Sequence, residues 1–206
     1  MPVGARSRFI AFEGGEGCGK STQATLLARS IGAVLTREPG GTELGTRLRD
    51  LLLDPLVGDI DPRAEALLMA ADRAHHVATV IRPALAAGDH VVSDRFAASS
   101  LAYQGFGRGL SLDEVREISE WATGGLWPDL TVLLDVPVEV AAARLGTDLD
   151  RFEQADDGFH RRVVEGFRSL AADNRSDWVV IDGVAAVDDV AAAVRAAVAE
   201  RLDLTA

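Results

Sequence analysis

The amino-acid sequence predicts an α/β fold: a five-stranded parallel sheet with helices on both faces. Short apolar runs alternate with longer segments of helical periodicity, as in a parallel sheet joined by helices. The run at 130–134 lacks the polar alternation of a half-exposed strand, so we expect it to be buried on both faces. A glycine-rich segment joins the first apolar run to the first helix. The length of 206 residues suits one domain, which we take as 1–206.

The first half of the chain predicts two strands and three helices. Asp61 and Pro62 are suited to the N-cap and first position of the third helix, and Gly88 to its end. The expected elements are the strands 8–12 and 33–36 and the helices 20–31, 42–53 and 61–88.

The long helix carries apolar residues at helical spacing, which we expect to face the core: Leu67, Ala71, Ala74, Ala78, Ile81 and Leu85. His75 and His76 have no metal-ligand partners nearby in the sequence, so we expect both on the helix surface.

The second half predicts strands at 90–93, 130–134 and 178–181 and a closing helix at 187–202. A helix is expected to start near Arg95, and Ser111 with Glu114 forms a capping box for the next one. We interpret Trp121 and Trp127 as packing residues.

Composition excludes several classes of function. The net charge of −11 argues against a nucleic-acid binder, because such affinity comes largely from basic surface. No apolar run approaches the ~20 residues of a membrane span, and no signal peptide is recognisable before the first strand. One cysteine excludes an internal disulfide and fits a reducing cytoplasm. Because the net charge is negative, any phosphate site must gather its basic residues locally.

The phosphate-binding pattern G-x-x-x-x-G-K-[ST] is matched at every fixed position of 14–21, in a strand–loop–helix context. Its Lys20 is the only lysine; the other twenty of the 21 basic residues are arginines. A chance lysine is the alternative, and the matching glycines weigh against it. The loop predicts a nucleoside triphosphate held by these residues: Gly14, Gly15, Glu16, Gly17, Cys18, Gly19, Lys20, Ser21 and Thr22. The hydroxyl group of Ser21 is suited to coordinate Mg²⁺.

Polar residues cluster directly after the strand at 90–93. Asp94 follows the carboxyl end of that strand, where open α/β sheets bind ligands. On a helix starting near Arg95, one wall would carry Arg95, Ser99, Ser100, Tyr103 and Gln104. This wall predicts a pocket; a solvated helix face is the alternative.

Two more groups of candidate site residues can be recognised: one follows the strand at 33–36, and the other lies on the long helix. The segment 36–42 reads Thr-Arg-Glu-Pro-Gly-Gly-Thr, with Arg49 further on, and Met69 and Arg73 are four residues apart on the long helix. Arg37, Arg49, Arg73 and Arg95 should converge on one edge of the sheet. The expected partner is a second anionic substrate.

Taken in order along nearly the whole chain, these motifs resemble bacterial thymidylate kinase. They are the loop, the segments 36–42, 71–73 and 94–104, and Pro-Asp-Leu-Thr at 128–131 with Leu-Asp at 134–135. The resemblance implies a P-loop kinase fold, usually a homodimer. It also implies transfer of the γ-phosphoryl group of ATP to dTMP with Mg²⁺, giving dTDP.

The resemblance also implies residue roles. Lys20 would hold the β- and γ-phosphates and Ser21 the Mg²⁺, with Asp94 acting on the metal through water. Glu16 would face the acceptor sugar, and Tyr103 would lie against the deoxyribose, where a 2′-hydroxyl would crowd it. The residues expected to bind dTMP are Arg37, Glu38, Pro39, Arg49, Met69, Arg73, Arg95, Ser99, Ser100, Tyr103 and Gln104. Among these, Arg95, Arg37 and Arg49 clamp the acceptor phosphate, and Arg73 reads the thymine with Ser99, Ser100 and Gln104.

Two features depart from the family pattern. Met69 stands where an aromatic residue usually stacks on thymine; a plain core methionine is the alternative. The loop has no arginine, with Gly17 in its place, so a short lid at about 145–157 must supply the cation. We expect Arg151 first and Arg144 second in that role, with surface ion pairs to nearby aspartates as the alternative, and Arg161 and Arg162 in solvent.

Three other functions stay open at this point. A kinase for another nucleoside monophosphate would use the same scaffold, and a catalytically weak relative would bind ATP without turnover. A P-loop switch protein is disfavoured, because its Asn-Lys-x-Asp motif needs a second lysine.

Overall fold

The computed structural model describes residues 6–147 and 149–204 and contains one parallel five-stranded sheet in the order β2-β3-β1-β4-β5. The strands are β1 (Phe9–Glu13), β2 (Val34–Arg37), β3 (Val91–Asp94), β4 (Leu130–Asp135) and β5 (Trp178–Asp182). β1 is central and pairs with β3 and β4, with Ala11 opposite both Ser93 and Thr131. The predicted fold is confirmed, and each strand lies within one residue of its predicted start and end.

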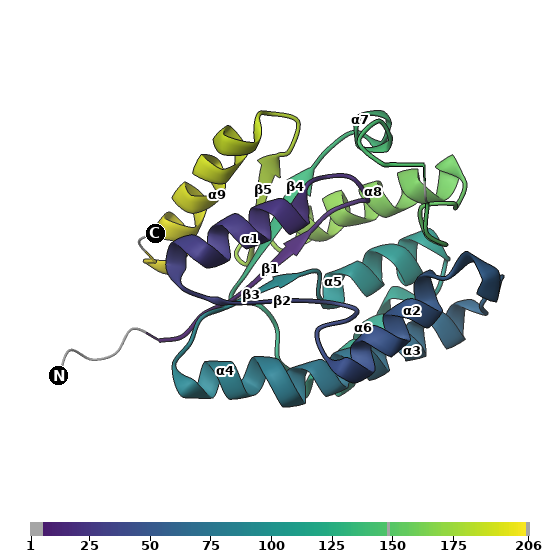
Figure 1. Cartoon of the computed structure of the whole chain (residues 1–206), viewed down its shortest axis with the longest axis horizontal. Coiled ribbons are helices and arrows are strands. Elements are labelled where there is room, and N and C mark those ends of the chain that lie inside the picture. The colour runs from purple at the N-terminus through teal and green to yellow at the C-terminus, as the bar shows by residue number, and fades with distance from the viewer. Residues whose placement is uncertain (1–5, 148, 205–206) are drawn as a thin grey trace.

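Helices cover both faces of the sheet (Figure 1). They are α1 (Lys20–Ile31), α2 (Glu43–Leu53), α3 (Pro62–His76), α4 (Arg82–Ala87), α5 (Ala97–Ser100), α6 (Leu112–Thr123), α7 (Val138–Ala142), α8 (Asp157–Asp173) and α9 (Val187–Leu202). The other helical segments are the 3-10 turn η1 (Pro55–Val57) and the π-helical η2 (Val77–Ile81) and η3 (Leu101–Gly107). Because η2 is a π-helical turn with helical residues on either side, α3, η2 and α4 form one continuous helix ending at Gly88.

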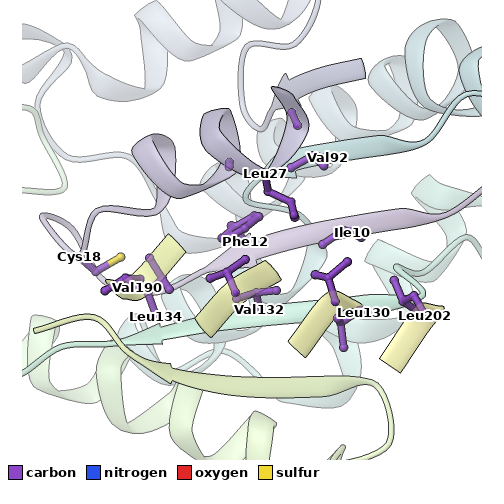
Figure 2. Packing of buried hydrophobic residues seen from close by; sticks show 14 of the residues in the cluster. Ile10, Phe12, Cys18, Leu27, Val92, Leu130, Val132, Leu134, Val190 and Leu202 are labelled. Carbon is purple, nitrogen blue, oxygen red and sulfur yellow. The ribbon is translucent and has the colours of Figure 1, made fainter. Parts of the chain in front are cut away.

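The core against α1 and α9 is mainly apolar (Figure 2). Ile10, Phe12 and Val132 from the sheet meet Leu27 of α1 and Val190 of α9. Burial of these branched and aromatic side chains, worth about 1.5–3 kcal/mol each, fixes α1 against β1. The loop between β1 and α1 is thereby held in place.

The other face is less purely apolar, and here the predicted core stripe of the long helix is only partly correct. Ile81 is buried and Leu85 packs against the core, but Leu67 is 57% exposed, and Ala71 and Ala78 also face outward. The buried side carries Ala66, Ala70 and Val77 together with charged and polar residues: Glu65, Asp72, Arg73 and His76. Periodicity fails because α3 turns its polar residues inward, toward a pocket.

Two further expectations of burial are wrong. His76 is fully buried, whereas His75 is exposed as predicted. Trp121 is 84% exposed on α6, whereas Trp127 is half-buried and packs as predicted. In the capping box, Ser111 accepts the backbone N–H of Glu114 as expected.

No helix in the described ranges combines the length and apolar character needed to cross a membrane.

Candidate functional site

The glycine-rich loop between β1 and α1 requires glycine at particular positions. Gly14, Gly17 and Gly19 have φ of 146°, 72° and 92°, in a region that side chains disfavour. At Gly17 a side chain would also overlap the carbonyl oxygen of Ala141. The docking of α7 on the loop therefore explains the glycine where the loop lacks an arginine.

Lys20 closes the loop on itself. Its Nζ donates to the carbonyl oxygen of Gly15 at 2.9 Å and lies 3.7 Å from Glu16 Oε2, with the side chain 7% exposed. This places one buried ammonium in the concave loop at the N-terminus of α1, where the helix dipole also favours anions.

Ser21 and Asp94 meet at the end of β3. Ser21 Oγ donates to Asp94 Oδ2 at 2.5 Å, and Asp94 Oδ1 is buried without a hydrogen-bond partner among the described residues. Both residues line a cavity together with Arg37 and Gly40.

A second cavity of about 550 Å³ lies beside the loop, and it gathers most of the side chains predicted to bind the second substrate. The predicted residues that line it are Glu16, Glu38, Pro39, Arg49, Met69, Arg73, Arg95, Ser99, Ser100, Tyr103 and Gln104. The Glu38–Pro39 peptide bond is cis. Met69 both lines the cavity and packs against buried core residues.

Arg95 is the link between the loop and this acceptor pocket. We expected Arg95 to begin the helix, but it precedes α5 and has a left-handed φ of 71°. Its guanidinium donates to Glu16 Oε1 at 2.6 Å, Tyr103 Oη at 2.9 Å and Ser99 Oγ at 3.1 Å. A backbone conformation this unfavourable persists where the surroundings enforce it, often at functional sites.

The charges around Arg95 are strongly coupled. Burial opposes ionisation of Glu16, but the charges of Arg95 and Lys20 outweigh it and hold the pKa of Glu16 well below its usual range. Burial likewise opposes the charge on Arg95, and Glu16 reverses this, so the pKa of Arg95 is raised. Both groups are charged at neutral pH.

Arg73 is held at the bottom of the pocket by buried partners. Its Nε donates to Glu38 Oε2 at 2.8 Å and its Nη2 to Ser100 Oγ at 3.0 Å. His76 Nδ1 lies 2.8 Å from Glu38 Oε1, and its Nε2 lies 2.6 Å from Thr36 Oγ1. The buried His76 therefore fixes the carboxylate that fixes Arg73, which is why the predicted surface position was wrong.

Arg37 and Arg49 lie close together beside Gly40. A side chain at Gly40 would contact both arginines, and Arg49 donates to the carbonyl oxygen of Pro39 at 3.1 Å. Burial, followed by the charges of Arg37 and Arg95, lowers the pKa of Arg49. Such a concentration of like charge favours binding of an anion.

The two lid arginines have other partners in this structure. Arg151 donates from Nη2 to Glu65 Oε2 at 2.7 Å and from Nε to the carbonyl oxygen of Leu52 at 2.7 Å. Arg144 donates from Nη1 to the carbonyl oxygen of Gly183 at 3.0 Å, in the loop after β5. Neither makes a surface ion pair with a neighbouring aspartate in the described lid; Asp148 lies outside the described residues. Arg161 and Arg162 are exposed, as predicted.

Sequence reasoning missed several buried acids at the site. Glu13 accepts from Ser99 Oγ at 2.6 Å and from the backbone of Phe96, and burial raises the pKa of Glu13 to about 7. Burial and the nearby Glu38 raise the pKa of Asp72 to about 6. Glu65 is four residues before Met69 and eight before Arg73, and this spacing could have placed it on the pocket side of the helix.

The fold and the loop together define a P-loop kinase: a parallel sheet, a phosphate-binding loop after its central strand, and a second pocket at the same carboxyl edge. A thymidylate kinase family model matches residues 12–194. The chain belongs to the thymidylate kinase family.

Individual relatives agree. The chain is 51% identical over 203 residues to a thymidylate kinase of Leifsonia xyli, covering 95% of this chain and 96% of the relative. It is 51% identical over 201 residues to that of Deinococcus radiodurans, covering 94% and 97%. A crystal structure of thymidylate kinase from Ehrlichia chaffeensis superposes with a TM-score of 0.77 at 31% identity, covering 93% of this chain and 98% of the other.

Proposed function

We propose that this protein transfers the γ-phosphoryl group of ATP to dTMP with Mg²⁺, giving dTDP, and that residues 1–206 form one kinase domain for this reaction. The observation that carries the proposal is that Arg95 contacts both sites. Its Nη1 donates to the carbonyl oxygen of Gly14 in the phosphate loop at 3.0 Å, and its side chain lines the acceptor pocket. Phosphoryl transfer depends on in-line positioning and charge stabilisation, which two adjoining cationic sites supply.

On the donor side, the loop from Gly14 to Ser21, with Thr22 behind it, cradles the phosphates through backbone N–H groups. Lys20 supplies the positive charge between the β- and γ-phosphates. It exchanges the carbonyl oxygen of Gly15 for phosphate oxygens when ATP is bound.

The residues near the loop fit Mg²⁺. The ion favours oxygen ligands and keeps several waters, so it needs few protein ligands. Ser21 offers a hydroxyl, and the buried Asp94 Oδ1, which has no partner among the described residues, can accept from a metal-bound water. The described residues include no cluster of three or more acidic, histidine or cysteine ligands, consistent with a metal held mainly by phosphate and water. When bound, Mg²⁺ neutralises charge on the phosphates.

On the acceptor side, Arg37, Arg49 and Arg95 bind the phosphate of dTMP. Arg73, Ser99, Ser100 and Gln104 read the base, and Met69 covers the ring, while Glu38 and Pro39 shape that wall. Glu16 and Tyr103 face the sugar. A buried donor such as Arg73 gives strong selectivity, because a base that does not accept its hydrogen bond leaves it unpaired.

The lid supplies the remaining charge. We assign this role to Arg151 first and Arg144 second. Arg151 must exchange Glu65 for the transferred phosphoryl group as the lid moves, and Arg144 must leave the carbonyl oxygen of Gly183.

A homodimer in the cytoplasm completes the proposal. The outward leucines Leu44 and Leu51 on α2 and Leu67 on α3, between 43% and 57% exposed, lie on two helices that pack together, and a second copy would cover them. Leu67→Glu should then give a monomer in sedimentation; a wild-type monomer would refute the dimer. The single cysteine fits a reducing compartment.

An acceptor panel tests the reaction. ADP release is measured with dTMP, dUMP, UMP, CMP, AMP and GMP. We expect kcat/KM to be highest for dTMP; another monophosphate that exceeds it about tenfold refutes the assignment. ATP binding without turnover on any acceptor would indicate a catalytically weak relative.

A further inference from the structure

Glu65 on α3 is fully buried, yet in the proposed reaction it is only the group that Arg151 leaves. It accepts hydrogen bonds from three side chains. Its Oε2 accepts from Arg151 at 2.7 Å and from Arg108 Nη2 at 3.2 Å, and its Oε1 accepts from Arg108 Nε at 3.3 Å and from Gln104 Nε2 at 3.0 Å. The two guanidinium groups fix the plane of the carboxylate, and Gln104 takes a remaining acceptor position on Oε1.

The chemistry of Glu65 fixes which end of the Gln104 amide faces it. The carboxylate of Glu65 forms ion pairs with two arginines and accepts hydrogen bonds from both. The NH₂ group of Gln104 must therefore point at Glu65. Gln104 is 1% exposed and lines the acceptor pocket, so its carbonyl oxygen is the end left for the ligand.

Arg73, the other reader of the base, is held in the same way. A buried acid, Glu38, accepts from its Nε; its Nη1 donates to Ser119 of α6 and its Nη2 to Ser100 at the pocket. The pocket thus presents an acceptor from Gln104 and donors from Arg73, each fixed by a buried carboxylate behind it. A pyrimidine with an N–H at ring position 3 and a carbonyl oxygen at position 4 complements this pair. Cytosine has an acceptor and an amino group at those positions.

We propose that Glu65 is a positioning residue that sets base selectivity: by holding the NH₂ of Gln104, it makes the pocket accept thymine or uracil and reject cytosine. The proposal rests on the proposed function, because it takes Gln104 as a reader of the acceptor base.

The test compares Glu65→Gln with the matched variant Arg108→Gln, using dTMP and dCMP as acceptors at saturating ATP. In E65Q the new amide can donate to Gln104 as well as accept from it, so the side-chain amide of Gln104 can flip and point its NH₂ group at the base. We expect the ratio of kcat/KM for dTMP to that for dCMP to fall about tenfold or more, chiefly through a higher KM for dTMP. R108Q removes one arginine, but Arg151 still donates to the same carboxylate, so Glu65 remains only an acceptor toward Gln104 and the ratio should equal that of the wild type. Glu65→Asp keeps a carboxylate that only accepts hydrogen bonds. It should therefore keep the ratio of the two kcat/KM values while lowering the rates with both acceptors.

Several outcomes overturn the proposal. An unchanged ratio in E65Q does so, as does an equal fall in R108Q, which would reduce Glu65 to a structural role. A wild-type enzyme that does not prefer dTMP to dCMP refutes the proposed function itself, which separates the two failures.

A measurement on the wild-type protein applies even if E65Q does not fold. In ¹⁵N–¹H spectra, with the side-chain signal assigned by its loss in Gln104→Leu, the NH₂ of Gln104 should shift little when dTMP is added. A large shift would place the NH₂ against the base and overturn the proposal.

Discussion

The donor loop and the acceptor pocket solve the same problem, holding a phosphorylated ligand, with opposite means. The loop is a contiguous stretch at 14–21 that relies on backbone groups, glycine conformations and one lysine. The pocket draws side chains from the segment after β2 and from α2, α3, α5, η3 and the lid, and it holds Arg73 and Gln104 through the buried acids Glu38 and Glu65. A site made from backbone can be recognised in a short motif, whereas one made from converging side chains depends on the whole fold.

The change Lys20→Ala should break the donor side alone, and it has the largest expected effect. Loss of the charge between the phosphates should lower kcat about a thousandfold or more. Binding of dTMP, measured by calorimetry without ATP, should stay near the wild-type value, because Lys20 does not line the acceptor pocket. A comparable loss of dTMP binding would show that the two sites are not separable.

The change Arg151→Ala tests whether the lid arginine acts on the transferred phosphoryl group. If Arg151 stabilises the transferred phosphoryl group, kcat should fall about a hundredfold to a thousandfold in steady-state assays. Arg161→Ala, which removes a 63% exposed arginine on α8, is the control and should change kcat little. A higher KM for dTMP with normal kcat would instead mean that Arg151 only anchors the lid through Glu65.

The change Arg73→Met should damage the acceptor side. The KM for dTMP should rise about a hundredfold while the KM for ATP stays the same. The variant should also lose about 3 kcal/mol of stability in urea unfolding, because the buried Glu38 loses its ion-pair partner. Arg116→Met, which removes an arginine near Trp127 away from the pocket, is the matched control. Equal rises in both KM values would contradict the assignment.

The smallest effect concerns Glu13, which lies between the two sites. Its pKa is raised from 4.5 to about 7, so the folded protein binds a proton more tightly than the unfolded chain. Its contribution to stability is therefore full below about pH 4.5 and is lost as the pH rises through about 7.

In Glu13→Gln this loss, about 3 kcal/mol, should disappear from the pH dependence of thermal unfolding. Asp72, with its pKa also raised, keeps part of the slope in the same direction. Glu43→Gln, at an 87% exposed carboxylate, should leave the slope as in the wild type. A slope in E13Q equal to that of the wild type would contradict the buried, protonatable Glu13.

The sequence predicted the strands, the loop and the polar wall at 94–104 because each depends on local patterns. It failed on α3, where Leu67 lies outside and Arg73 inside, because period alone does not say which face of a helix meets a polar pocket. Glu13, Glu65 and His76 were missed or misplaced for a related reason. Charged residues read as surface residues, and only the tertiary partners that satisfy them reveal their burial.

The solitary Lys20 gives the chain an unusual chemical property. It is the only side-chain amine in the sequence, and it lies 2.9 Å from a carbonyl oxygen within the phosphate loop. An amine-directed acylating reagent can therefore label just one side chain of this type. The rate of that labelling reports whether the loop is occupied, which turns a feature of composition into an occupancy probe that requires no engineered residue.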